Sequence, residues 1–185
     1  TLDIGGDKDV PYLDLPAETN PFLGQRGIRL SLGAHSDLFE TQLRALLRAA
    51  AAGDGTLSVM FPLVATLDEL TAALDAVERV ARDLDTEGIE YATPELGVMI
   101  ETPAAIFMAE AFADKVDFLS IGTNDLAQYV MAADRENEAV ADLHAPQQPA
   151  VLQAVQRAVQ YATTPHAWHG MADETASDPE PTCPP

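Results

Sequence analysis

Two carboxylates are the residues of this sequence whose spacing best suits chemistry. Glu101 directly follows the apolar run 96–100, and Asp125 comes just after the apolar run 116–121. If these runs are parallel strands of one sheet, their carboxyl ends share one edge, where α/β proteins place their sites. Two carboxylates there can hold Mg²⁺, a hard cation that takes few protein oxygens. Acidic residues also stabilise the first turn of a helix, so helix capping is the alternative role.

Three arginines stand out because basic residues are scarce. The chain has 10 Lys and Arg against 30 Asp and Glu among 185 residues, a net charge of −20. Arg26 and Arg29 lie at the exit of the irregular segment 7–25, and Arg135 follows the Asn124-Asp125 pair. A guanidinium group can grip phosphate or carboxylate through two hydrogen bonds. In so acidic a chain, an ordinary salt bridge explains each arginine equally well.

Composition excludes several classes of partner and location. The negative charge disfavours nucleic acid and anionic membranes, and no apolar run approaches the ~20 residues that span a bilayer. The single cysteine, Cys183, rules out an internal disulfide and favours a reducing, cytoplasmic location. Cys183 lies in a Pro-rich stretch without a positioned base. His166 and His169 are three apart but have no third ligand in view, which favours surface histidines.

The elements that must position these residues alternate along the chain. Apolar runs predict short strands, each followed by an amphipathic helix, and polar residues follow three of the strands at Asp3, Glu101 and Asn124-Asp125. Thr66 and Glu69 form a capping-box pattern. We expect strands at 1–4, 57–61, 96–100 and 116–121, with a fifth near Ala167, and helices at 37–52, 67–84 and 104–113. A last helix opens at Pro149, with Leu152, Val155 and Val159 as its apolar stripe.

This alternation predicts an α/β fold with a parallel sheet covered on both faces by helices. A closed barrel of eight βα units needs about 250 residues, so this chain cannot complete one alone. We expect one domain over residues 1–163. Residues 164–185 are expected to form a divergent, Pro-rich and disordered tail.

Several segments together resemble the phosphoenolpyruvate-binding barrel of enzyme I, the phosphoenolpyruvate–protein phosphotransferase family of the sugar phosphotransferase system. The resemblance covers most of the chain and is specific in the aggregate. The segments that carry it are 1–8 (TLDIGGDK), 18–29 (ETNPFLGQRGIR), 59–62 (VMFP), 97–104 (GVMIETPA), 118–129 (FLSIGTNDLAQY) and 134–135 (DR).

The resemblance implies a fold, a ligand and a set of site residues. The fold would be a (β/α)8 TIM barrel, incomplete here with about four to five of the eight βα units. Glu101 and Asp125 would hold Mg²⁺, while Arg26, Asn124 and Arg135 would bind phosphoenolpyruvate. In the family, phosphate passes to an enzyme histidine in an amino-terminal half absent from this chain, and then to the phosphocarrier protein HPr. The family's barrel domain also forms a homodimer.

Departures from the family pattern limit what this chain alone is expected to do. Ala172 occupies the position of the family's cysteine, which is thought to protonate the enolate, and Asp173 replaces the neighbouring glycine. A phosphate-binding arginine of the family would directly precede Thr1. We therefore assign no catalytic residue and expect incomplete activity. Two alternatives stay open: a segment of a pyruvate phosphate dikinase or phosphoenolpyruvate synthase, or a non-catalytic remnant acting only as a dimerisation module.

Overall fold

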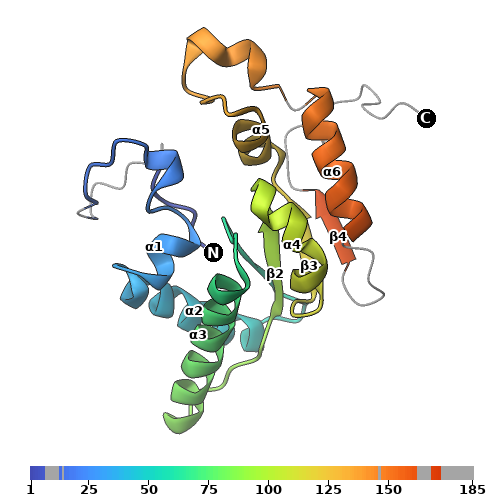
Figure 1. Ribbon diagram of the computed structural model, residues 1–185. Coiled ribbons are helices and arrows are strands. Elements are labelled where there is room, and N and C mark those ends of the chain that lie inside the picture. Colours follow the sequence, from blue (N-terminus) through green and yellow to red (C-terminus); the bar gives the residue numbers. More distant parts are fainter. Residues whose placement is uncertain (7–12, 14, 146, 162–167, 172–185) are drawn as a thin grey trace. The chain divides into compact units, whose positions relative to one another are not determined.

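The computed structural model describes residues 1–6, 13, 15–145, 147–161 and 168–171, the last four by their backbone (Figure 1). The chain divides into two compact units, residues 1–97 and 98–185. Helices alternate with short strands in the order β1-β2-β3-β4, which makes a small parallel sheet. The α/β class predicted from the sequence is confirmed. Within the described residues, no helix is long and apolar enough to cross a membrane.

The first unit contains mostly helices, one complete strand and, at residues 95–97, the first half of a second strand. Its elements are the 3-10 helix η1 (Pro21–Leu23), α1 (Ile28–Leu32), α2 (Ser36–Ala52), β1 (Ser58–Phe61) and α3 (Leu67–Thr86). The helix α2 buries Phe39, Leu43 and Leu47, and the Phe39 ring meets the Phe61 ring edge-on, with centroids 6.3 Å apart. Edge-to-face contact is a favoured aromatic geometry. This packing gives the unit an apolar centre.

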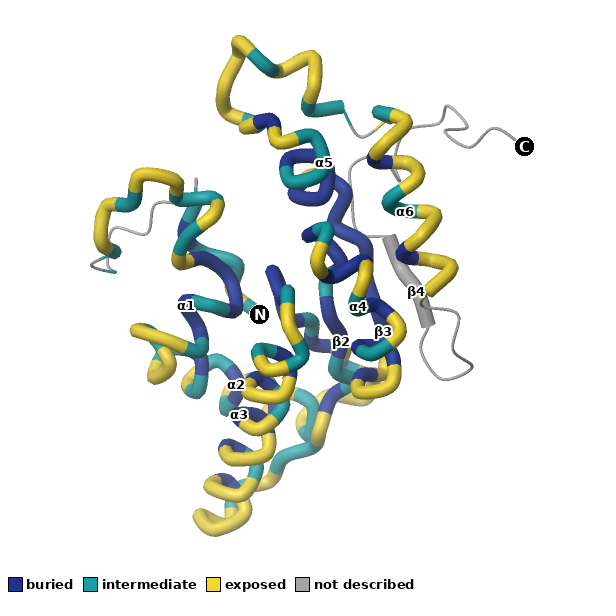
Figure 2. Tube along the Cα trace, viewed as in Figure 1, coloured by how far each residue is buried: buried dark blue, intermediate teal, exposed yellow. Residues whose placement is uncertain are grey.

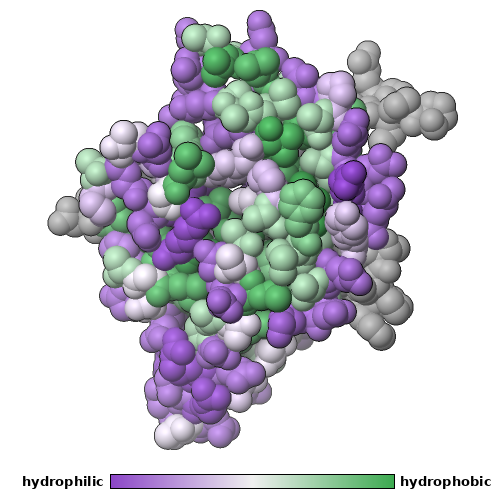
Figure 3. Space-filling model, in the orientation of Figure 1, coloured by the Kyte–Doolittle hydropathy of each residue, from purple (hydrophilic) through white to green (hydrophobic). Residues whose placement is uncertain are grey.

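The helix α3 follows its sequence pattern closely. The Thr66 side chain accepts a hydrogen bond from the Glu69 N–H, and the Glu69 carboxylate accepts from the Thr66 N–H, which completes the predicted capping box. Its apolar stripe is buried at Leu70, Val77 and Leu84. The other face is polar, and Figure 3 shows hydrophilic side chains gathered over the lower end of this helix.

The second unit is richer in strands. Its elements are the second half of β2 (Glu95–Ile100), α4 (Pro103–Ala113), β3 (Phe118–Ile121), α5 (Thr123–Met131), the 3-10 helix η2 (Glu138–Leu143), α6 (Pro149–Tyr161) and β4 (Trp168–Met171). The strand β4 runs parallel to β3, with Phe118 opposite Trp168 and Ile121 opposite Met171. It confirms the fifth strand expected near Ala167. All four residues of β3 are buried, as a strand inside a parallel sheet requires.

The strand predicted at residues 1–4 is not formed. The Thr1 amino group donates to the Met60 carbonyl and the Leu2 N–H to the Gln42 side chain, while the Ile4 carbonyl accepts from the Gly27 N–H at 3.0 Å. These partners lie on three different segments. No regular ladder can form with partners so scattered, and Gly5 alone makes an isolated bridge.

The predicted stripe of α6 is wrong as a buried face. The helix packs against α4 and α5 and buries Val151 and Ala158, which are seven residues and two turns apart. Leu152 is 36% and Val159 43% exposed, so this apolar stripe lies largely outside the packed face (Figure 2). The small side chain of Ala158 allows a neighbouring helix to approach closely. Hydrophobicity by itself could not predict that α6 buries Ala158 instead of Leu152 or Val159.

The structure also contains three short elements that the sequence did not predict, namely η1, α1 and η2. Asp125 lies in the first turn of α5, which fits the capping role considered for it. Within the predicted disordered tail 164–185, residues 168–171 form the strand β4. Residues 164–167 and 172–185, which include His166, Ala172 and Cys183, lie outside the described residues, as do residues 7–12 and 14 of the irregular segment.

Candidate functional site

Arg26 is the most deeply buried charged residue of the first unit. Its side chain has no solvent exposure, and one guanidinium nitrogen lies 2.9 Å from Asp3 Oδ2. The guanidinium carbon is 5.7 Å from the centroid of the Phe22 ring, within cation–π range. A buried charge is costly unless a counter-charge and hydrogen bonds compensate it. Asp3 and Phe22 therefore hold Arg26 in one charged arrangement, and the salt bridge considered for this arginine is present.

Gly27 brings the start of the chain against Arg26. Its φ of 54° and ψ of −129° are a combination open to glycine alone among ordinary residues. A Cβ atom here would lie 2.9 Å from the Leu63 Cβ and 3.2 Å from Asp3 Oδ1. The Gly27 N–H also donates to the Ile4 carbonyl. The absence of a side chain at Gly27 thus lets Asp3 reach Arg26 from a segment far away in the sequence.

Arg29 contacts both the loop before Arg26 and the start of α3. Its guanidinium donates to the carbonyls of Leu23 and Gly24, both at 3.3 Å, and lies 3.6 Å from the Glu69 carboxylate. These contacts tie the loop before Arg26 to the first turn of α3. Glu18, which sequence reasoning missed, stabilises the same loop by accepting the Gln25 N–H at 2.9 Å.

In the second unit, Glu101 lies at the carboxyl end of β2 and is 2% exposed. It is not needed to cap α4, because Thr102 is the N-cap and accepts the Ala105 N–H at 3.1 Å. The turn after β3 comes very close to it. A Cβ atom built on Gly122 would lie 3.0 Å from Glu101 Oε2 and 2.6 Å from the Met99 sulfur. The buried carboxylate thus faces the turn that leads into Asp125.

Asp125 lies in the first turn of α5 and is 8% exposed. Its carboxylate Oδ1 is 3.5 Å from Arg135 Nη1, so the structure brings these two predicted residues together. Its place in the first turn also suits the helix dipole, so the capping interpretation and the ion pair apply together. Asn124 is exposed, and its carbonyl lies 2.9 Å from His144 Nε2.

Gln128 is a further residue of this site that sequence reasoning missed. It is 5% exposed, and its Oε1 accepts the N–H of Arg135 at 3.0 Å. The signal that could have found it is its place three residues after Asp125 in α5, on the same helix face.

The donor set at Glu101 and Asp125 fits Mg²⁺ better than a metal that needs a full protein cage. Within the described residues, no cluster of three or more His, Cys, Asp or Glu could hold an ion. Mg²⁺ commonly uses one or two carboxylates and takes its other ligands from phosphate and water. Glu101 and Asp125 follow the neighbouring strands β2 and β3, and the backbone at Gly122 lies close to the Glu101 carboxylate. Two carboxylates are the number of protein ligands that Mg²⁺ commonly uses.

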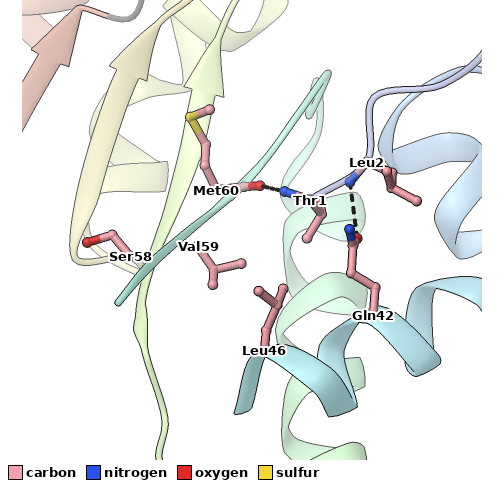
Figure 4. A pocket seen from close by; sticks show the side chains of 7 residues that line it. All are labelled: Thr1, Leu2, Gln42, Leu46, Ser58, Val59 and Met60. Atoms are coloured by element: carbon pink, nitrogen blue, oxygen red, sulfur yellow. Dashed lines mark hydrogen bonds between the residues drawn. The ribbon is translucent and has the colours of Figure 1, made fainter. Parts of the chain in front are cut away.

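A pocket of about 270 Å³ opens in the first unit away from these residues (Figure 4). Leu46 and Val59 form part of its wall, and the Leu2 N–H donates to Gln42 Oε1 at 3.1 Å beside it. None of the predicted site residues lines this pocket.

Replacing Gly122 by alanine is expected to destabilise the chain by about 1–3 kcal/mol, the usual cost of overpacking. The added methyl group would overlap the Met99 sulfur and crowd the Glu101 carboxylate. Urea unfolding followed by circular dichroism measures the effect. Gly55→Ala is the matched control, since nothing lies within 4 Å of a Cβ there. Equal stability of the two variants would contradict the close approach at Gly122.

The fold and these residues define a class: an α/β chain in which acidic and amide side chains follow two strands of the second unit, and in which each unit holds one arginine paired with an aspartate. The family model described as "PEP-utilising enzyme, PEP-binding domain" matches residues 1–183. The chain belongs to this family of phosphoenolpyruvate-utilising enzymes, and the resemblance seen in the sequence is confirmed.

Similar proteins carry the name phosphoenolpyruvate-protein phosphotransferase. The protein of Haloferax volcanii is 63% identical over 98% of this chain and 32% of its own length. Those of Geobacillus stearothermophilus and Enterococcus faecalis are 52% and 49% identical over 97% and 96% of this chain, and 31% of their own lengths. The chain thus spans about a third of these relatives.

Among solved structures, a citrate lyase from Burkholderia xenovorans is similar with a TM-score of 0.53. It shares 18% sequence identity, and the match covers 71% of this chain and 40% of that chain. This likeness concerns the fold alone.

Proposed function

We propose that this chain is a phosphoenolpyruvate-binding part of a phosphoenolpyruvate–protein phosphotransferase and that it binds phosphoenolpyruvate together with Mg²⁺. The observation that carries the proposal is the pairing of Asp125 with Arg135 at 3.5 Å, after the carboxyl end of β3. The names of the similar proteins favour this activity over that of a dikinase or synthase.

The arginines would supply the positive charge that an anionic substrate needs. With a net charge of −20, the chain repels phosphoenolpyruvate at long range, so the few cationic groups matter more than their number suggests. Arg26 and Arg135 each lie against one carboxylate, Asp3 and Asp125. A phosphate or carboxylate group of the substrate would share or take over these guanidinium groups through bidentate hydrogen bonds. Asn124, which is exposed, would add an amide contact.

Glu101 and Asp125 are the residues that would hold Mg²⁺. When bound, the ion would neutralise charge on the phosphoryl oxygens. Phosphoryl transfer depends mainly on positioning and charge stabilisation rather than on covalent chemistry by the protein. Buried side chains such as Glu101 suit that role because they keep one orientation.

The rest of the reaction is proposed from the family resemblance of the sequence. Phosphate would pass from phosphoenolpyruvate to a histidine of the enzyme and then to the carrier protein HPr, in a cytoplasmic homodimer. No histidine of this chain lies in a segment that matches the family's phosphorylated histidine. The family's cysteine position is Ala172, so we propose that this chain contributes binding rather than full turnover.

Isothermal titration of the folded chain with phosphoenolpyruvate tests this proposal. We expect saturable binding at millimolar ligand or below when MgCl₂ is present, and much weaker binding with a chelator. Asp125→Asn is expected to remove the Mg²⁺ dependence, because it removes a ligand of the ion. Asp114→Asn is the matched control, since Asp114 is an exposed residue of the same unit. A chain that is folded by circular dichroism yet releases no heat above buffer would refute the proposal.

A further inference from the structure

Gln128 holds the turn that follows α5 by accepting hydrogen bonds from three backbone N–H groups, the first of them from Ala132 to its main-chain carbonyl. Its side-chain Oε1 accepts the N–H of Arg135 at 3.0 Å, and its main-chain carbonyl accepts the N–H of Ala133 at 3.1 Å. The turn itself needs such support, because Ala132 takes a left-handed conformation with φ of 52° that costs free energy in any residue except glycine. One residue of α5 thus binds the backbone at the reversal and just after it.

The geometry divides the placing of Arg135 between two residues of one helix face. Gln128 and Asp125 are three positions apart, which puts them on neighbouring turns of α5. Gln128 binds the backbone of Arg135, and the Asp125 carboxylate lies 3.5 Å from its guanidinium. The hydrogen bond from Gln128 fixes the backbone of Arg135, and the ion pair with Asp125 fixes the position of its guanidinium group. An arginine side chain is long, so a fixed backbone matters for the position of its charged end.

Packing alone does not explain a glutamine at this position. The side chain is 5% exposed, and its Nε2 has no hydrogen-bond partner among the residues that the structure describes. Burying an unsatisfied amide nitrogen costs free energy that an apolar side chain of similar size would avoid. The acceptor oxygen is the part of Gln128 that methionine could not replace.

We propose that Gln128 is a positioning residue for phosphoenolpyruvate binding: it holds the backbone of Arg135 so that the guanidinium reaches the substrate's anionic group beside Asp125. The inference rests on the proposed function, in which Arg135 binds the substrate. It assigns Gln128 no contact with the substrate itself.

The test uses Gln128→Met, which keeps the length of the side chain and removes the acceptor. We expect the affinity for phosphoenolpyruvate with Mg²⁺ to fall about five- to tenfold, as for loss of one hydrogen bond. The affinity for Mn²⁺ alone, read by electron paramagnetic resonance, is expected to change less than about twofold, since Arg135 is no metal ligand. In an Arg135→Met background the second substitution is expected to add no further loss. Gln153→Met, at an exposed position of α6, is the matched control.

A purely structural role would weaken metal and substrate binding together, and it would weaken substrate binding equally in the Arg135→Met background. Either result would overturn the proposal. Gln128→Glu keeps an acceptor oxygen and is expected to preserve slow hydrogen exchange at the Arg135 amide, which Gln128→Met should accelerate. If Gln128→Met does not fold, Gln128→Asn, whose shorter side chain withdraws the oxygen, replaces it in the same comparison.

The exchange measurement needs no substrate and separates the two proposals. A wild-type chain that binds no phosphoenolpyruvate would refute the proposed function. Equal protection of the Arg135 amide in wild type and Gln128→Met would refute the positioning role.

Discussion

Replacing Arg26 by methionine is expected to weaken phosphoenolpyruvate binding about 100-fold or more, because the substrate would lose a bidentate cationic partner. The same change is expected to lower the free energy of unfolding by about 2–3 kcal/mol. Arg26 is completely buried against Asp3, whose side chain is 19% exposed, so its removal leaves a largely buried carboxylate without that counter-charge. This loss of unfolding free energy is smaller than the ~3–5 kcal/mol typical of breaking a fully buried pair, because the Asp3 side chain retains some solvent contact.

Stability and binding can be separated with a second substitution. In an Arg26→Met and Asp3→Asn double variant, the stranded negative charge is gone, so we expect much of the lost stability to return while binding does not. Arg48→Met, on the exposed face of α2, is the matched control and should change neither quantity. Urea unfolding and isothermal titration measure the two effects. If the double variant regained phosphoenolpyruvate affinity, Arg26 would act only through stability.

Replacing Glu101 by glutamine is expected to have the largest effect on metal binding, a loss of about 100-fold or more in Mg²⁺ affinity. Mg²⁺ binds charged carboxylate oxygens in preference to neutral amides, and only two acidic residues are proposed as its ligands. The amide has the same size as the carboxylate. The free energy of unfolding measured without metal is therefore expected to stay within about 1 kcal/mol of the wild-type value.

The diagnostic measurement is thermal unfolding with and without MgCl₂ and phosphoenolpyruvate. A ligand that binds the folded state raises the unfolding temperature, so wild type should shift and Glu101→Gln should not. Glu110→Gln, an exposed position on α4, removes the same charge from the same unit and should shift like wild type. Equal shifts in all three proteins would show that Glu101 is no ligand.

Local patterns in the sequence determined most of the secondary structure. Thr66 and Glu69 cap α3, and Thr102 with Pro103 begins α4, because capping hydrogen bonds join residues only three apart. The strand-end position of Glu101 follows from another local pattern, the apolar run 96–100 that precedes it. Interactions between residues so close in the sequence can be predicted from their spacing, since the few residues between the partners allow few conformations.

The tertiary structure alone decided what the site residues contact. Asp3 reaches Arg26 across 23 positions, and Arg29 is tied to Glu69 at the start of α3. On α6 the packing buries Val151 and Ala158 instead of the more hydrophobic Leu152 and Val159. The segment at residues 1–4 forms no strand, because its hydrogen bonds go to three separate partners.

The sequence by itself determined the family, and it predicts which residues carry the chemistry, because residue types and their order along the chain are enough for both inferences. Only the tertiary structure decided that Arg26 is buried against Asp3 and that Gln128 holds Arg135. The physical reason is that such contacts depend on which distant segments meet. Local conformational preferences carry no information about which distant segments come into contact, because the packing of the whole unit determines those contacts.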